Sequence, residues 1–288
     1  MNVEPECVLC FYQQALNTLQ FLRVHQKKKF DILGRISTYL SSIRKFKETP
    51  CFYSSKIYHL IHREIKNTDP YQQVKKQYNS LILGKYRSLQ KIVSQYQDPL
   101  LGALKLSAIG NSIDFGITNA ININDEIKKH KNIRFFKNDH PLLAKALKNA
   151  SHVMLLCDNA GEFIFDKLLM ETILRFYPVR FTLVVKDKPI INDITMKDIP
   201  RNLFTYPVDI ISNGNDKVGT ILSCCSAEFF KKWVEADFII SKGQGNFETL
   251  DHFKKKLIFF LFKSKCDVVS KYLQVKKNSY LFMANTQR

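Results

Sequence analysis

The feature that most constrains the fold is residues 151–166, SHVMLLCDNAGEFIFD, where an apolar run stops abruptly at a group of polar residues. The run has the length and composition of a buried strand, and apolar residues at helical spacing resume at Phe163. We therefore predict a strand, a tight polar turn and a helix. Ligands of open α/β sheets bind at the carboxyl ends of strands, which is where this unit places Asp158 and Asn159.

The residue types of the turn also indicate which ligands it can bind. Carboxylate and amide oxygens are suited to a hard divalent cation, so Asp158 and Asn159 are candidate ligands. Gly161 permits a close turn of the backbone, and the N-terminus of the following helix favours an anion. A cation beside an anion indicates phosphate chemistry. The alternative is that Asp158 and Asn159 only cap the helix.

Strand-like and helical segments alternate through the second half of the chain, which predicts a doubly wound, mainly parallel sheet. The further strand candidates are residues 133–136, 180–186, 208–212, 236–241, 257–262 and 280–282. Residues 1–105 instead show apolar residues at three- and four-residue spacing, which is typical of helices. We predict an α/β protein with a helical N-terminal subdomain, residues 1–105, and an α/β domain, residues 106–288.

Polar residues also follow other strand candidates. Asp193 lies in the loop after a strongly β-branched segment, in the same relative place as Asp158, so both side chains should face one crevice. A segment of small residues before the sheet carries Asn111 and Asp114. These two side chains can either enter the site or merely cap and turn the chain.

Two glycine-bearing loops are candidate phosphate contacts. Lys242 and Gly243 directly follow the strand candidate at 236–241, and a cation beside accessible backbone suits a phosphate group. A solvated lysine in a flexible loop is the alternative. Around Gly214, backbone amides can cradle an oxyanion, although an Asn-Gly pair is also an ordinary turn.

Composition excludes some classes of protein. The chain has 288 residues, which suits one large domain or two smaller ones, and its hydrophobic fraction of 45% is too high for disorder. No apolar run approaches the ~20 residues that span a bilayer, and the N-terminus lacks the basic region of a signal peptide. The odd number of scattered cysteines, seven, suits reduced thiols. We expect a cytoplasmic protein without membrane contacts.

The formal net charge is +18, from 44 Lys and Arg against 26 Asp and Glu. Such a charge ordinarily suggests nucleic-acid binding. Lysine is spread along the whole chain, however, and the abundance of Lys, Ile and Asn indicates a general composition bias. A solvated, lysine-rich surface is therefore favoured, and we expect no nucleic-acid partner.

Cys7 and Cys10 form a CxxC pair near the start of the chain. A zinc site would need a second pair of ligands, for which Cys51, His59 and His62 are candidates at irregular spacing. A redox pair would be expected to follow a strand, and the chain has barely begun at this point. We favour structural or weakly functional thiols.

Several motifs occur together in one order. The strings CDNAGEFIFD, KDKPIINDIT, SNGNDKVGT and SKGQGNFETL follow AIGNSIDFG, and CVLC heads the chain. In this combination the chain resembles the damage-control phosphatase family, in particular its microbial CxxC-bearing branch. The resemblance implies a helical subdomain beside a three-layer α/β/α sandwich. It also implies metal-dependent hydrolysis of small phosphorylated metabolites, such as sugar phosphates or damaged cofactor intermediates.

The resemblance also implies roles for individual residues. Asp158 and Asn159 match the metal-binding Asp-Asn pair of the family, and Asp193 matches its third ligand, in the NDxT motif. Lys242, in the KGxxN motif, matches the lysine that contacts phosphate. The family cation is drawn from Mn, Co, Ni and Mg, so the resemblance does not determine which ion binds here.

On this basis we predict that one divalent cation polarises a phosphoryl oxygen and lowers the pKa of a bound water. Glu162 or a ligating aspartate would orient or deprotonate that water, unless Asp158 itself forms an aspartyl-phosphate. The residues expected to contact the substrate or its phosphate are Lys242, Gly243, Asn246, Asn111, Asp114 and Gly214. Asp166 could face the site from the helix or have a structural role.

Other classes of function stay open at this stage. Some relatives have been proposed to methylate protein carboxylates with S-adenosylmethionine, and a doubly wound sheet can bind that cofactor. No glycine-rich GxGxG loop follows the first strand candidate, however. A non-enzymatic nucleic-acid-binding protein and an idle metal-binding scaffold are the remaining alternatives. The sequence determines neither the natural substrate nor the oligomeric state.

Overall fold

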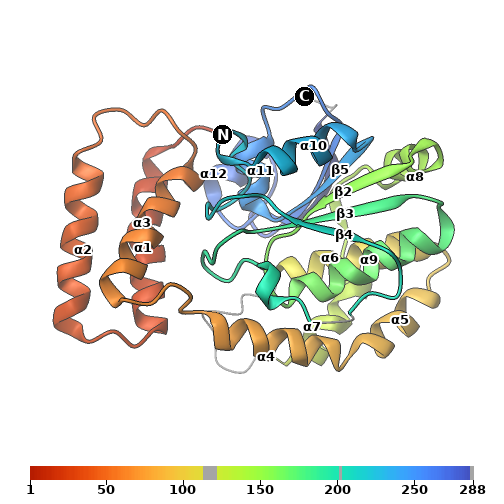
Figure 1. Cartoon of the computed structure of the whole chain (residues 1–288), viewed down its shortest axis with the longest axis horizontal. Helices are drawn as coiled ribbons and strands as arrows, with labels where there is room; N and C mark the ends of the chain where they lie inside the picture. The colour runs from red at the N-terminus through yellow and green to blue at the C-terminus, as the bar shows by residue number, and fades with distance from the viewer. Residues whose placement is uncertain (113–121, 201–202, 286–288) are drawn as a thin grey trace.

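The computed structural model describes residues 1–112, 122–200 and 203–285, which form a seven-stranded sheet with helices on both faces (Figure 1). The strands are β1 (Phe135–Asn138), β2 (His152–Leu156), β3 (Arg180–Val185), β4 (Asp209–Ser212), β5 (Phe238–Lys242), β6 (Ile258–Lys263) and β7 (Tyr280–Ala284). Their order in the sheet is β1-β7-β6-β5-β2-β3-β4. Neighbours are parallel except for the antiparallel pair β6 and β7. The predicted α/β/α sandwich with a doubly wound, mainly parallel sheet is confirmed.

The central strands are continuous apolar runs because helices cover both faces of the sheet. Every residue of β2 and of β5 is buried. From this central pair, β3 and β4 extend the sheet on one side, and β6 and β7 extend it on the other. The strand order therefore reverses between β2 and β5, and such a switch point is where doubly wound sheets bind ligands. Asp158 follows β2 and Gly243 follows β5 at this point.

The helices cover the sheet in two layers. They are α1 (Pro5–Phe21), α2 (Gln26–Ser41), α3 (Pro50–Ile65), α4 (Gln72–Leu83), α5 (Tyr86–Ser94), α6 (Pro99–Ser112), α7 (Ile123–Lys128), α8 (His140–Asn149), α9 (Glu162–Phe176), α10 (Ala227–Glu235), α11 (Gln244–Leu250) and α12 (Asp267–Leu273). Side chains of α5, α6, α8 and α9 share one apolar core with Leu155 of β2. Side chains of α10, α11 and α12 share a second core with Leu156. Adjacent strand residues point to opposite faces, so the two cores lie on opposite sides of the sheet.

Helices α1, α2 and α3 form a separate group beside the sandwich (Figure 1). Their apolar cluster includes Phe11, Leu19, Ile36 and Ile61, together with Ile190 from the loop that follows β3. The three helices are therefore attached to a loop at the carboxyl ends of the strands, next to the residues predicted to form the site.

The remaining N-terminal helices belong to the sandwich. Helices α4 and α5 contribute Ile82 and Leu89 to the core that α9 shares with the sheet. Helix α6 continues through residue 105, where the predicted domain boundary lies, and packs along α9. The division of the chain into two domains stays a prediction. Among the described residues, no helix combines the length and apolar character needed to cross a membrane.

Candidate metal and phosphate site

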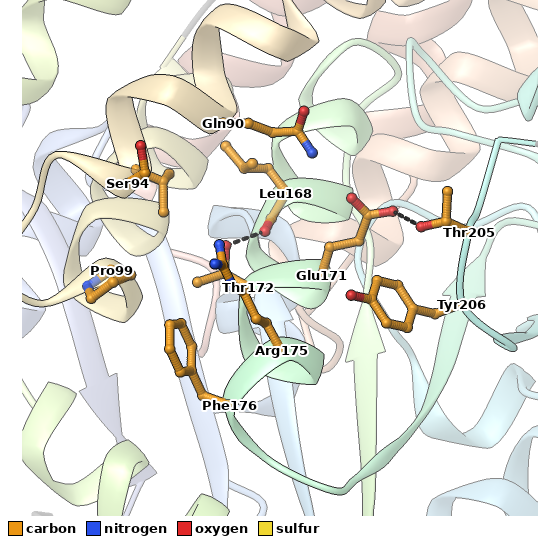
Figure 2. Close-up of a pocket in the computed structure, with 11 residues that line it drawn as sticks. Gln90, Ser94, Pro99, Leu168, Glu171, Thr172, Arg175, Phe176, Thr205 and Tyr206 are labelled. Atoms are coloured by element: carbon orange, nitrogen blue, oxygen red, sulfur yellow. Dashed lines mark hydrogen bonds between the residues drawn. The ribbon is translucent and has the colours of Figure 1, made fainter.

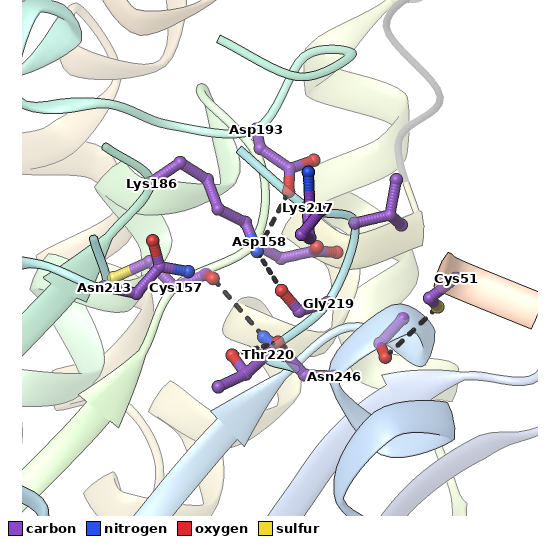
Figure 3. Close-up of polar contacts among 12 residues, drawn as sticks. Cys51, Cys157, Asp158, Lys186, Asp193, Asn213, Lys217, Gly219, Thr220 and Asn246 are labelled. Atoms are coloured by element: carbon purple, nitrogen blue, oxygen red, sulfur yellow. Dashed lines mark hydrogen bonds and ion pairs between the residues drawn. The ribbon is translucent and has the colours of Figure 1, made fainter. Parts of the chain in front are cut away.

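The three predicted cation ligands lie together where β2 and β3 end. An isolated bridge pairs the backbone of Asn159 with that of Asp193. The Ile194 N–H donates to the Asp158 carbonyl at 2.9 Å, and the Ala160 N–H donates to the Asn192 carbonyl at 3.0 Å. Backbone hydrogen bonds thus join the two loops directly, and Asp158 and Asp193 lie close together in the resulting crevice (Figure 3).

Gly243 allows the loop after β5 to approach the same point. Its φ is +84°, in a backbone region that residues with a Cβ atom rarely adopt. A Cβ atom on residue 243 would lie 2.0 Å from Asp158 Oδ2, which is far inside van der Waals contact. The structure therefore brings Gly243 to the candidate ligands, although its predicted contact with phosphate stays a prediction.

The electrostatics of the crevice favour a cation. Burial, Glu162 and Asp193 together raise the pKa of Asp158 well above its usual range. Burial also raises the pKa of Asp193 to about 6, against the opposing effect of Lys186. Asp193 Oδ2 is buried and accepts no hydrogen bond from any described residue. A divalent cation would offset the repulsion and occupy this oxygen, so the donor set fits the predicted ion.

The amide of Asn159 leaves one atom available for such an ion. Its Nδ2 donates to Asp158 Oδ2 at 3.0 Å and to Glu162 Oε2 at 3.3 Å, so Oδ1 is the atom left to face a cation. Within the described ranges, no three His, Cys, Asp or Glu side chains converge on one ion. The third predicted ligand is accordingly an amide, and the carboxylates alone do not make a three-ligand site.

The same finding gives no support to the zinc alternative for the CxxC pair. The cluster considered there, Cys7, Cys10, Cys51, His59 and His62, does not form in the described structure. Cys51 Sγ instead donates to Glu248 at 3.3 Å, and His59 Nε2 lies 3.2 Å from Asp216. Both thiols of the CxxC pair are free. Burial raises the pKa of Cys7 to about 11, so this thiol is protonated at neutral pH.

Glu162 and Asn111 stand directly behind the ligands. Glu162 is fully buried, and its Oε2 accepts from Asn111 Nδ2 at 3.0 Å. Asn111 Nδ2 also donates to Asp158 Oδ2 at 3.1 Å. Helix α6 thus supplies an amide that holds one ligand and one buried carboxylate in place. Asp114, the other predicted residue of this segment, lies outside the described residues.

Lys242 lies deeper than the sequence suggests. It is the last residue of β5 and is fully buried, with Nζ 2.5 Å from both Glu162 Oε1 and Asp166 Oδ1. Burial acts to lower the pKa of Lys242, but Asp166 and Glu162 outweigh it and raise the pKa. The ammonium group therefore stays charged behind Glu162, away from the described pocket wall. Its predicted contact with phosphate stays a prediction.

Two further predicted residues, Asn246 and Gly214, contact parts of the fold outside the pocket lining. Asn246 is buried and donates through Nδ2 to the carbonyls of Cys157 and Lys242, at 3.4 and 2.7 Å (Figure 3). Gly214 packs against Ser226 at the start of α10, where an added Cβ would lie 2.5 Å from the Ser226 Cβ. Neither residue belongs to the described lining of the pocket, and their predicted phosphate contacts stay untested.

The candidate ligands open into a pocket of about 280 Å³. The wall facing them comes from α1, α3 and the start of α4, and consists mainly of neutral polar and aromatic side chains. These are Gln14, Asn17, Thr18, Phe21, Ser54, Tyr58 and Tyr71. The N-terminal helices, which carry none of the predicted metal or phosphate contacts, thus form a large part of the pocket wall.

Two lysines near the ligands were not predicted. Lys186 is buried directly after β3, donates to the Gly219 carbonyl and lies 3.6 Å from Asp193 Oδ2 (Figure 3). Lys265 is exposed shortly after β6, lines the pocket and acts to lower the pKa of Asp158. Both follow strand ends, so the rule that located Asp158 and Asp193 would also have located them.

A second pocket, of about 320 Å³, lies at the other end of α9 (Figure 2). It is lined by side chains that include Gln90, Glu171, Arg175 and Tyr206. Its lining residues on α9 run from Leu168 to Phe176, which is about 9–21 Å along the helix axis from Glu162 at the start of the helix. Its Glu171 is already paired with Lys167 at 2.6 Å. We therefore place the functional site at the strand ends.

Comparisons with known proteins identify relatives over almost the whole chain. The sequence profile of the family described as damage-control phosphatase ARMT1-like domain matches residues 3–281. The chain is 30% identical over 290 residues to a protein named damage-control phosphatase from Pyrococcus horikoshii, with 99% of both chains covered. It is 31% identical to an uncharacterized protein of Methanocaldococcus jannaschii, over 96% of this chain and 93% of that protein.

A solved structure agrees with these relationships. The crystal structure of a DUF89 family protein from Pyrococcus horikoshii superposes with a TM-score of 0.88 at 29% sequence identity. The match covers 99% of this chain and 100% of that one, so it includes the N-terminal helices as well as the sandwich. From its sequence and its fold, the chain belongs to the damage-control phosphatase ARMT1-like family.

Proposed function

We propose that the protein is a metal-dependent phosphatase that hydrolyses small phosphorylated metabolites in the pocket above Asp158, Asn159 and Asp193. The observation that carries this proposal is the convergence of these three side chains at the carboxyl ends of the strands, around a buried Asp193 oxygen. This oxygen accepts no hydrogen bond in the described structure and lies 3.6 Å from the ammonium group of Lys186. Family membership supports the phosphatase activity, since the relative from Pyrococcus horikoshii is named a damage-control phosphatase.

The candidate ligands would hold one divalent cation, drawn from Mn, Co, Ni and Mg. Such a cation supplies Lewis-acid polarisation of a phosphoryl oxygen and of a water molecule. Asp158 and Asp193 lie on the pocket wall, whereas Glu162 is fully buried. We therefore propose that one of the two aspartates accepts the proton of the attacking water. Glu162 then keeps the amides of Asn111 and Asn159 in place, through the hydrogen bonds that Oε2 accepts.

We assign the positively charged side chain that faces the phosphoryl group to Lys265. It lies on the described pocket wall, and none of the ion pairs within the described structure involves its Nζ. Lys242, by contrast, holds Glu162 and Asp166 from behind. A free ammonium group beside the aspartates can neutralise charge that develops on the phosphoryl oxygens.

The pocket supports a small, hydroxylated leaving group. Its volume of about 280 Å³ is at the lower end of small-molecule pockets. The wall opposite the aspartates carries amide and hydroxyl groups, from Gln14, Asn17, Thr18 and Ser54, that can bind neutral polar groups. Sugar phosphates meet these requirements, and we propose them as the first class to assay.

The proposal is tested by hydrolysis of an aryl phosphate after chelation and after addition of Mn, Co, Ni or Mg. Asp158→Ala and Asp193→Ala should abolish turnover and weaken Mn²⁺ binding. Asp187→Ala is the matched control, because Asp187 follows β3 in the same loop but is exposed and outside the described pocket lining. Wild-type turnover and metal affinity in both ligand variants would contradict the proposed site. Calorimetric binding of S-adenosylmethionine without hydrolysis would favour a methyltransferase instead.

A further inference from the structure

We propose that Asn79 and Lys75 of α4 are positioning residues that set the spacing between the two loops carrying the candidate metal ligands. This inference rests on the proposed function, because it concerns the geometry of the same cation site. No motif in the sequence points to α4, and the helix lies outside the strand ends that make up the rest of the site.

Asn79 contacts both loops at once. Its Oδ1 accepts from the Gly161 N–H at 2.6 Å, in the turn that also contains Asp158 and Asn159. Its Nδ2 donates to the carbonyl of Asp198 at 2.8 Å, in the segment that begins at Asp193. The side chain is 4% exposed, so water does not compete for these hydrogen bonds. One amide thus connects the loop after β2 with the loop after β3.

Lys75 makes a second attachment to the same segment. Its side chain is fully buried, and Nζ lies 2.9 Å from Oδ2 of Asp198 and 2.9 Å from Oδ2 of Asp69. Asp198 Oδ2 also accepts from the backbone N–H and the hydroxyl of Thr195, at 2.9 and 2.7 Å. A buried ammonium group is costly without its carboxylate partners. The ion pairs of Lys75 therefore fix the position of Asp198 relative to α4.

The side chains that α4 buries indicate that these contacts hold the two loops in position. The fully buried residues of α4 are Lys75, Asn79 and Ile82, whereas Val74, Tyr78 and Leu83 pack partly buried against the main core. The apolar side chains attach the helix to the core. Because buried ion pairs are weak sources of stability, the buried polar pair instead indicates a positioning role. Tyr71, which precedes α4, lines the pocket. The segment from Asp69 to Asn79 therefore links the pocket wall to both ligand loops.

The ligand loops depend on such contacts because they contain little regular structure. Between Asp193 and Asp198, the described segment forms isolated backbone bridges at Asp193 and Thr195 and a short 3₁₀ turn, Met196–Asp198. Residues that hold ligands in place from outside the coordination shell typically change metal affinity 10- to 100-fold when they are removed. We therefore expect loss of Asn79 to weaken metal binding about tenfold or more, because the backbone hydrogen bonds that join the two loops are then no longer supported by the side-chain contacts from α4.

The test compares Asn79→Ala with Asn285→Ala in the full chain. Asn285 is 5% exposed and also connects backbone groups, since it contacts the carbonyls of Phe253 and Lys256 and the N–H of Ile258. Ile258 begins β6, so these contacts lie at the amino ends of the strands, whereas the site lies at the carboxyl ends. Mn²⁺ alone is titrated by calorimetry, and thermal stability is measured on the same samples.

Both variants should lose thermal stability, but only Asn79→Ala should bind Mn²⁺ about tenfold or more weakly than wild type. Added Mn²⁺ should restore its aryl phosphatase activity. Wild-type Mn²⁺ affinity in Asn79→Ala, or equal loss in Asn285→Ala, overturns the positioning role and leaves the proposed function intact. Absence of Mn²⁺ binding and hydrolysis in the wild type overturns both. If Asn79→Ala does not fold, Asn79→Asp, which retains an acceptor for Gly161, is judged by the same criteria.

Discussion

Gly243 and Asp158 approach each other so closely that a Cβ atom on residue 243 would lie 2.0 Å from Asp158 Oδ2. Gly243 follows β5 and Asp158 follows β2, so the contact crosses the switch point of the sheet. The main chain of one strand end thus forms part of the wall around the carboxylate on the other. A residue without a side chain is required here by both the backbone conformation and the space.

We predict that Gly243→Ala removes metal-dependent hydrolysis, because the added methyl group displaces Asp158 from its position. The variant should also be destabilised by about 1–3 kcal/mol, since its φ of +84° is unfavourable for alanine. Gly34→Ala is the control, because residue 34 lies in α2 with nothing within 4 Å of the added Cβ. That change should leave activity unaltered and stabilise the helix by up to about 1 kcal/mol. Mn²⁺ titration and urea unfolding measure the two effects.

Lys265→Ala should raise the KM for an aryl phosphate roughly tenfold or more, since a charge-assisted contact to the phosphoryl group is lost. Inhibition by inorganic phosphate should weaken in parallel, whereas Mn²⁺ affinity should not fall. Lys265→Arg should retain most of the binding. Lys148→Ala, an exposed change on α8, serves as the control for a general charge effect. Unchanged KM and unchanged phosphate inhibition in Lys265→Ala would exclude Lys265 as the phosphoryl contact.

Lys242→Met should destabilise the fold by about 3 kcal/mol or more, because Glu162 and Asp166 would be left buried without their shared cation. Urea unfolding measures this loss. Lys232→Met removes a surface pair with Asp209 and should cost less than about 1 kcal/mol. Adding Asp166→Asn to Lys242→Met should recover part of the stability. If the two lysine variants are equally stable, the buried network does not support the fold.

His62 should make stability depend on pH. Burial, reinforced by His59, lowers the pKa of His62 from 6.5 to about 4. Between these two values the unfolded chain binds more protons than the folded chain, so stability falls as the pH falls through this window. The contribution is at most about 3 kcal/mol. Urea unfolding at about pH 7 and pH 4.5 should therefore show a smaller loss for His62→Phe than for wild type. Equal losses would show that His62 titrates normally.

Much of the sheet could be predicted from local sequence. Each strand of the described sheet overlaps a segment that apolar runs and β-branched residues had indicated, because a strand buried on both faces must be apolar along its length. The convergence of Asp158 with Asp193 also followed from sequence, because the carboxyl ends of parallel strands meet at one edge. The same rule applies to Lys186 and Lys265, which also follow strand ends.

Other parts of the site required the tertiary structure. The sequence predicts Lys242 directly after a strand, but it is the last residue of β5, and the alternation of side chains along a strand turns it toward α9 instead of the pocket. A shift of one residue in the strand end decides this orientation, and local sequence does not determine strand ends that closely. Asn79 and Lys75 gave no signal because a polar residue in a helix is usually exposed.

By itself, the sequence determined the elements, the faces that they bury and the family, because apolar periodicity and short polar motifs are local properties. The tertiary structure decided which distant side chains meet: the amide of Asn79 with Gly161, the ammonium of Lys242 with Asp166, and the polar face of α1 with the aspartates. These contacts join residues far apart in the chain, and they depend on how whole layers pack, which no local pattern encodes.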